Sequence, residues 1–430
     1  MPLTLFAAAT PDPPLAMIVP FALLLLAIAL MPVLHLHWWE RHFPKVAVGL
    51  GGVTTAYYLI VMGNGGRMLQ VAHEYLSFIA LIGSLFVVAG GIHIDIKGEA
   101  KPLINCLYLL MGAVLANVIG TTGASMLLIR PWIRMNKYRV TAFHIVFFIF
   151  IVSNVGGCLT PVGDPPLFLG YIKGVPFWWV LQRCWVAWAV AVAGLIGIFF
   201  VLDRQNFLRA PKSIREKETQ REIWKVEGWR NLVFLGVILA AVFIKHPAGL
   251  GEALMFAAGI ASWFATPERI HRANVFTFHP IREVAWLFLG IFATMTPVLD
   301  YMEIHAGALG LDSEMKYYWF TGLLSGTLDN APTYLTFLAA AMGREHLSLN
   351  QPYDVLTFVA KHDHQLIAIS LGAVFFGAMT YIGNGPNFMV RAISQQAKVQ
   401  TPGFFSYILK YAVPILLPLL AFISLLLRFQ

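Results

Sequence analysis

The chain has 430 residues, of which 58% are hydrophobic and only 12% are charged, and its mean hydropathy is +0.70. Soluble domains carry about 25% charged residues, so this composition excludes a soluble globular protein and indicates a polytopic membrane protein. The net charge of +8 does not indicate a nucleic-acid partner, because the basic residues lie in short segments that flank apolar stretches.

Apolar stretches of spanning length follow one another along the whole chain. They cover residues 15–34, 46–62, 75–92, 103–119, 140–153, 177–202, 231–245, 249–265, 284–299, 316–341, 365–382 and 404–427. A helix that crosses a bilayer needs about 20 residues. We therefore expect an all-α fold of about ten to twelve membrane elements in contact with the lipid bilayer, some of them broken or re-entrant.

One long polar segment, residues 203–229, divides the chain close to its midpoint. We expect a first transmembrane repeat over residues 1–202 and a second over 230–430, joined by this basic linker. Arginine and lysine are concentrated in 130–139 and in 203–230. Because basic loops stay on the cytoplasmic side, we expect both there, in a multi-pass protein of the bacterial inner membrane.

Two polar segments rich in glycine and proline interrupt apolar stretches about 220 residues apart. The sequence LTPVGDPP at 159–166 aligns with MTYIGNGP at 379–386. Proline removes a backbone donor and glycine relaxes a helix, so both segments are expected to be unwound. Unwound backbone at membrane depth needs protein or a wet cavity around it, and breaks in corresponding places of two halves indicate a transporter's binding site.

A second pair of polar features precedes these breaks. The sequence VIGTTG at 118–123 falls opposite TLDNAP at 327–332, and further upstream SLFVVAG at 84–90 falls opposite WLFLGIF at 286–292. The polar pair is typical of the tip of a re-entrant hairpin. Three pairs of matching segments occur in the same order in the two halves of the sequence. This order predicts two inverted repeats, each with a re-entrant hairpin and a broken helix.

Four motifs carry a resemblance to a known superfamily. They are SNVGG at 153–157, TPVGD at 160–164, LDNAPT at 328–333 and YIGN at 381–384. The chain resembles the ion-transporter superfamily, which includes NhaD-type sodium/proton antiporters, arsenite permeases and citrate or dicarboxylate carriers. It is most similar to the NhaD type, which has a similar Gly-Gly…Pro-Ile-Gly-Asp break and a similar Asp-Asn-x-Pro tip.

The resemblance implies secondary active transport, commonly by a homodimer in which one half-domain moves relative to a scaffold. Sodium-coupled dicarboxylate carriers place Ser-Asn-Thr at both hairpin tips, where this chain has GTT at 120–122 and LDN at 328–330. The tips therefore favour the antiporter. Transport of arsenite, citrate or a dicarboxylate stays open as the alternative.

Two aspartates are the strongest candidates for the chemistry. Asp164 lies in the first break and Asp329 at the second tip. An isolated charge at the bilayer centre costs on the order of 3 kcal/mol, so such carboxylates usually mark ion paths. They can bind a sodium or lithium ion and the competing proton, which is the minimal basis of antiport. The alternative is that either aspartate caps a half-helix.

Neutral oxygen and amide groups complete the predicted ion or substrate site. The set comprises Asp164, Asp329, Asn154, Thr160, Asn330, Thr333, Thr380 and Asn384, and Asn387 is a further polar residue nearby. Asp164, Asn154, Asp329 and Asn384 are the predicted sodium ligands. Sodium is expected as the transported or coupling ion, and no other cofactor is expected.

One further alternative follows from the acidic residues. An intramembrane aspartyl protease needs paired carboxylates, but its usual Gly-x-Gly-Asp and Tyr-Asp signatures are absent here, because Pro161 and Leu328 occupy the decisive positions. The chain is therefore not expected to be an enzyme. Asp300 lies just beyond a predicted span and is expected to be solvated.

Overall fold

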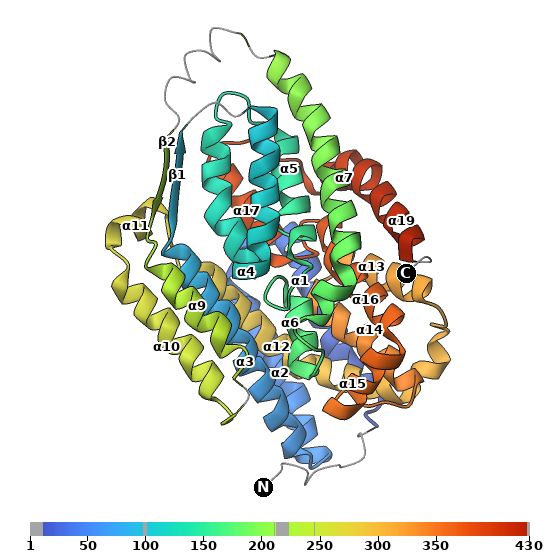
Figure 1. Ribbon diagram of the computed structural model, residues 1–430. Coiled ribbons are helices and arrows are strands. Elements are labelled where there is room, and N and C mark those ends of the chain that lie inside the picture. Colours follow the sequence, from blue (N-terminus) through green and yellow to red (C-terminus); the bar gives the residue numbers. More distant parts are fainter. Residues whose placement is uncertain (1–11, 98–100, 210, 212–222, 245, 428–430) are drawn as a thin grey trace.

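The structure is a computed structural model that describes residues 12–97, 101–209, 211, 223–244 and 246–427. The described part is an all-α polytopic membrane protein with one small two-stranded sheet, in which β1 (His93–Lys97) pairs antiparallel with β2 (Ile223–Glu227) (Figure 1). By length and composition alone, seven of its helices could cross a membrane, one of them the hairpin Pro102–Met135 described below, and four shorter apolar helices accompany them.

Most of the helices follow the predicted apolar stretches, whereas four short ones, over residues 165–173, 268–273, 352–361 and 385–396, lie between them. The helices are α1 (Val19–Leu34), α2 (Leu36–Ala56), α3 (Gly65–Gly90), α4 (Pro102–Met135), α5 (Ala142–Ile151), α6 (Pro165–Lys173), α7 (Trp179–Arg209), α9 (Asn231–Ala241), α10 (Leu250–Ala265), α11 (Glu268–Ala273), α12 (His279–His305), α13 (Glu314–Thr327), α14 (Asn330–Arg344), α15 (Pro352–Lys361), α16 (Asp363–Phe376), α17 (Gly385–Gln396), α18 (Phe404–Tyr407) and α19 (Leu417–Leu426).

The expected linker contains regular structure at both ends, since α7 continues into it and β2 occupies its last part. Residues 210 and 212–222 of the linker lie outside the described residues. The described start of the linker lies beside the first basic segment, because Arg139 binds Asp203 and its carbonyl accepts from Asn206 Nδ2 at 3.3 Å.

The long α4 is a hairpin and not a single span. Its direction reverses at Gly120, where φ is 77°, a conformation that glycine adopts without strain. The two arms lie side by side, because Asn105 Nδ2 donates to Asn136 Oδ1 at 2.9 Å and the Tyr108 hydroxyl donates to the Leu128 carbonyl at 2.8 Å. These contacts confirm the predicted re-entrant hairpin of the first repeat.

The second repeat contains the matching hairpin, formed by α13 and α14, which pack against each other. In the first repeat α5 and α6 flank a break, and in the second repeat α16 and α17 do so. The α4 hairpin lies in the upper part of Figure 1, whereas the hairpin of α13 and α14 lies lower and to the right. The hairpins thus reach the centre from opposite sides, in an inverted arrangement.

Within the two repeats, a group of helices packs beside the hairpins and breaks. It comprises α2 and α3 of the first repeat and α9, α10 and α12 of the second, with α2 against α12 and α3 against α10. Phe78 of α3 stacks on Phe288 of α12, with ring centroids 4.4 Å apart, and also contacts Phe168 of α6. This aromatic cluster joins the helix group to the first broken helix.

Asp300 is buried and paired, so the expectation that it is solvated is wrong. It forms a salt bridge with Arg67 at 2.8 Å and accepts a bond from the Tyr58 hydroxyl at 2.8 Å. The physical reason is that α12 extends past Asp300 to His305 and packs that turn against α3. Hydropathy alone places the end of the span too early.

A second buried ion pair connects α3 with the broken helix α6. Lys173 Nζ lies 2.7 Å from Glu74 Oε1, and it also donates to Asn350 Oδ1 at 3.3 Å. Glu74 accepts a further bond from Gln70 at 3.0 Å. Buried charges are tolerated when paired and hydrogen-bonded in this way, so the pair fixes how α6 meets α3.

Candidate functional site

The two breaks are built alike. In the first, the hydroxyl of Thr160 accepts the backbone N–H of Gly163 at 3.1 Å; in the second, the hydroxyl of Thr380 accepts that of Gly383 at 3.1 Å. Each threonine thus satisfies a donor that the interrupted helix leaves free. The equal geometry confirms the predicted alignment of the two breaks.

Each hairpin tip is bonded to the break of its own repeat. Thr121 N donates to the Gly163 carbonyl at 2.7 Å, and Asn330 N donates to the Gly383 carbonyl at 3.2 Å. A Cβ atom on either glycine would collide with a backbone carbonyl across the break. Glycine is therefore required at both positions, and the contacts place the two tips at equivalent points of the two repeats.

Asp164 lies where these four segments meet. Its side chain is 1% exposed and accepts three hydrogen bonds. Thr121 Oγ1 donates to Oδ1 at 2.7 Å, Asn384 Nδ2 donates to Oδ1 at 2.9 Å, and Asn330 Nδ2 donates to Oδ2 at 2.7 Å. The donors come from the first tip, the second break and the second tip, so both repeats stabilise the ionised carboxylate.

Among the described residues no arginine, lysine or histidine forms an ion pair with Asp164. The negative charge of the ionised carboxylate is stabilised only by hydrogen bonds from neutral groups. Burying a carboxylate without a cation is unfavourable even when it is hydrogen-bonded. The arrangement can therefore gain stability from either a proton or a small cation.

Asp329 has a different geometry. It is the N-cap of α14, and its Oδ1 accepts the backbone N–H of Ala331 at 3.0 Å. The hydroxyl of Thr333 donates to the Asp329 carbonyl at 2.8 Å, which is a bond within the same helix turn. Asp164 also precedes a helix, but its side chain makes no capping bond there. The structure thus places Asp329 at the helix end and Asp164 among the polar groups of both repeats.

Asn154 and Asn384 are brought together with Asp164. Asn154 is fully buried and accepts from Asn384 Nδ2 at 3.2 Å. Thr121 is absent from the residues selected from sequence, although it donates directly to Asp164. The signal for it was available, because the alignment of the two tips sets Thr121 opposite Asn330.

A family model described as "Putative citrate transport" matches residues 10–428. The chain belongs to this transporter family. It is also 26% identical over 322 residues to a "46 kDa membrane protein" of Mycobacterium leprae (strain TN), a match that covers 70% of this chain and 72% of that protein. The protein is therefore a multi-pass membrane transporter and not an enzyme.

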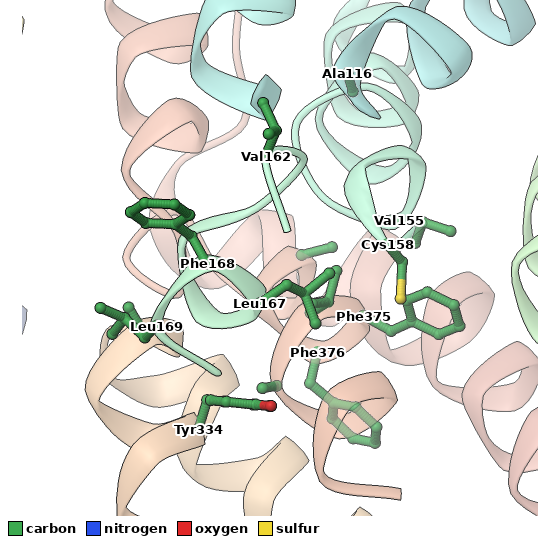
Figure 2. Packing of buried hydrophobic residues seen from close by; sticks show 14 of the residues in the cluster. Ala116, Val155, Cys158, Val162, Leu167, Phe168, Leu169, Tyr334, Phe375 and Phe376 are labelled. Carbon is green, nitrogen blue, oxygen red and sulfur yellow. The ribbon is translucent and has the colours of Figure 1, made fainter. Parts of the chain in front are cut away.

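Apolar side chains surround the polar centre and separate it from lipid and water. Figure 2 shows ten of them, from α4 (Ala116), the first break (Val155, Cys158, Val162), α6 (Leu167, Phe168, Leu169), α14 (Tyr334) and the end of α16 (Phe375, Phe376). All are buried. In such surroundings electrostatic interactions with Asp164 are stronger than they are in water.

A small cavity of about 20 Å³ lies beside Asp164. It is bounded by α3 through Leu81, Leu85 and Phe86, by the first tip at 120–123 and by the first break at 161–165. A cavity holds one water when it offers about 10–15 Å³ to a water-sized probe. The space beside the carboxylate therefore matches one water molecule or one small ion.

No group of three or more His, Cys, Asp or Glu side chains in the described part of the chain could hold a metal ion. Transition metals prefer such nitrogen, sulfur and carboxylate clusters. Here the available ligands are one carboxylate and neutral oxygens of amides, hydroxyls and backbone.

Proposed function

We propose that this transporter exchanges sodium or lithium ions for protons, and that both bind in turn at Asp164. The observation that carries the proposal is the geometry of this carboxylate. It is buried, has no cationic partner among the described residues, and receives hydrogen bonds from both repeats. A cation and a proton compete for the same oxygens, so binding of one releases the other.

The neutral partners allow this competition. The hydroxyl of Thr121 and the amide of Asn330 donate to the ionised carboxylate, and each also has an oxygen that can turn toward a cation. Neither partner changes its own charge. Only the proton or the cation then neutralises Asp164, which couples the two fluxes.

A transport assay in everted membrane vesicles tests the proposal. Respiration acidifies the vesicle interior and quenches a ΔpH-sensitive dye, and added sodium or lithium is expected to restore fluorescence. Vesicles from cells that lack the protein are the control. Absence of any response to alkali cations over about pH 6 to 9, where buried acids titrate, would refute the proposal.

Citrate transport is the second candidate, and the description of the matched family favours it. Helices α6 and α17 begin at the two breaks, and α14 begins at the second tip. The N-terminus of a helix attracts carboxylates. The cavity of about 20 Å³ argues against it in this conformation, because a tricarboxylate is much larger. The same vesicles, challenged with citrate, succinate and arsenite, separate these substrates from alkali cations.

A further inference from the structure

A chain of three asparagine side chains leads to Asp164. Asn387, in the first turn of α17, is completely buried, and its Oδ1 accepts a bond from Asn154 Nδ2 at 2.7 Å. Asn154 Oδ1 accepts in turn from Asn384 Nδ2 at 3.2 Å, and Asn384 Nδ2 donates to Asp164 Oδ1 at 2.9 Å. These hydrogen-bonded amides, called the amide chain below, belong in turn to the second repeat, the first repeat and the second repeat before the last of them reaches the carboxylate of Asp164.

The direction of each amide in this chain is fixed by backbone carbonyls. Every amide nitrogen donates to at least one of them, at 2.8 to 3.1 Å: Gly377 and Thr380 for Asn387, Ile149 for Asn154, and Ser153 for Asn384. A carbonyl only accepts, so turning any of these amides over would place two acceptors face to face. The two hydrogens of Asn384 Nδ2 are shared among three acceptors, the Ser153 carbonyl, Asn154 Oδ1 and Asp164 Oδ1. The Asn154 side chain, which bonds to Asn387, therefore takes part in keeping the nitrogen of Asn384, and not its oxygen, toward Asp164.

The other two partners of Asp164 are adaptable. The hydroxyl of Thr121 rotates freely about its bond, and the side-chain nitrogen of Asn330 has Asp164 Oδ2 as its one described partner. Both can change from donor to oxygen ligand when the carboxylate is neutralised. Of the two carboxylate oxygens, Oδ1 thus has a fixed donor and Oδ2 has only an adaptable one.

We propose that Asn387 is a positioning residue for ion exchange. It acts through Asn154 to hold Asn384 as a permanent donor to Oδ1 of Asp164, so that the exchanged proton and cation bind at Oδ2, beside Asn330. The inference rests on the proposed exchange at Asp164. It adds the residue that sets how strongly this carboxylate prefers its ionised form over its protonated form. A donor held against a carboxylate favours its ionised form.

The inverted repeat supports a role beyond holding the break together. With the register of the two breaks, Asn387 corresponds to Leu167 and Asn154 to Val374, and both of these are buried apolar residues. The first break is bridged by a different amide, that of Asn117, which donates to and accepts from its backbone. The fold of a broken helix therefore does not require an asparagine at the position of Asn387.

Two other titratable groups act on Asp164. Asp329, at the second tip, and Cys158, in the first break, both interact electrostatically with its carboxylate. Neither belongs to the amide chain. Since both stay unchanged in the variants below, a shift in the pH profile reports the amide chain itself.

The test uses Asn387→Leu, Asn154→Val and the double variant, which place at each position the residue that the other repeat carries. In proteoliposomes, the pH of half-maximal sodium/proton exchange is expected to rise by on the order of one pH unit, because a fixed donor to the ionised carboxylate is lost. The double variant should shift no further than one single variant, since both changes break the same chain. Asn231→Leu, at a buried asparagine of α9 whose amide bonds to Gly91, Ser262 and Thr266, away from Asp164, is the matched control and should leave this pH unchanged.

An unchanged midpoint in folded Asn387→Leu protein, or a double-variant shift equal to the sum of the single ones, overturns the inference while exchange itself stands. If Asn387→Leu does not fold, Asn154→Val breaks the same chain and decides. If the wild type shows no exchange, the proposed function fails. The pH dependence of the thermal unfolding temperature then reports proton binding without transport: an upward shift in the variants supports the amide chain, and its absence overturns it.

Discussion

Replacing Asp164 with asparagine separates charge from shape at the centre of the site. The new side chain keeps an oxygen for the bonds from Thr121 and Asn384, at 2.7 and 2.9 Å, but sets an NH₂ group against the donor of Asn330 at 2.7 Å. The amide of Asn330 has no other described side-chain bond and can turn over to accept. The variant is therefore expected to fold.

The change in the free energy of unfolding caused by Asp164→Asn is the sum of two opposing effects. A hydrogen bond to a charged group contributes about 1.5–3 kcal/mol, and removal of a buried charge without a cationic partner offsets that loss. The expected change in the free energy of unfolding is therefore below about 2 kcal/mol. Exchange, in contrast, should fall to background, because the variant carries no group at this position that binds a proton or neutralises a cation.

The assay compares sodium-driven proton exchange and thermal unfolding for purified wild type and Asp164→Asn in proteoliposomes and in detergent. A folded variant with lost exchange supports the assignment. A folded variant that exchanges within about twofold of the wild type would refute the reasoning, because the carboxylate would then be structural.

Three further outcomes are expected. Asp329→Asn should keep at least about half of the exchange rate, since asparagine caps a helix nearly as well as aspartate; a loss as complete as that of Asp164→Asn would contradict the capping geometry. Lys173→Met should lower the free energy of unfolding by about 3–5 kcal/mol, and Glu74→Gln in the same chain should restore most of it, as measured by thermal unfolding; no recovery in the double variant would argue against the pair. An impermeant thiol reagent should label Arg204→Cys only after cells are permeabilised, because the three native cysteines are buried and the basic segment is expected in the cytoplasm; labelling of intact cells would reverse the orientation.

The sequence by itself determined the membrane class, the approximate helices and the two interruptions. The bilayer imposes local requirements, about 20 apolar residues for a crossing and glycine or proline where a helix is interrupted, so these features can be recognised without neighbours. The alignment of the breaks also placed Thr160 and Thr380 in equivalent turns, because a repeated sequence folds into a repeated local geometry.

Only the tertiary structure decided which polar groups meet. The donors to Asp164 lie 43, 166 and 220 positions away, so the sequence did not reveal the contacts that distinguish this aspartate from Asp329, which the same sequence rules also selected. The pairing of Arg67 with Asp300, 233 residues apart, was likewise invisible in hydropathy. A buried polar group must find its partners in three dimensions, and the folding of two inverted repeats onto one centre supplied them here.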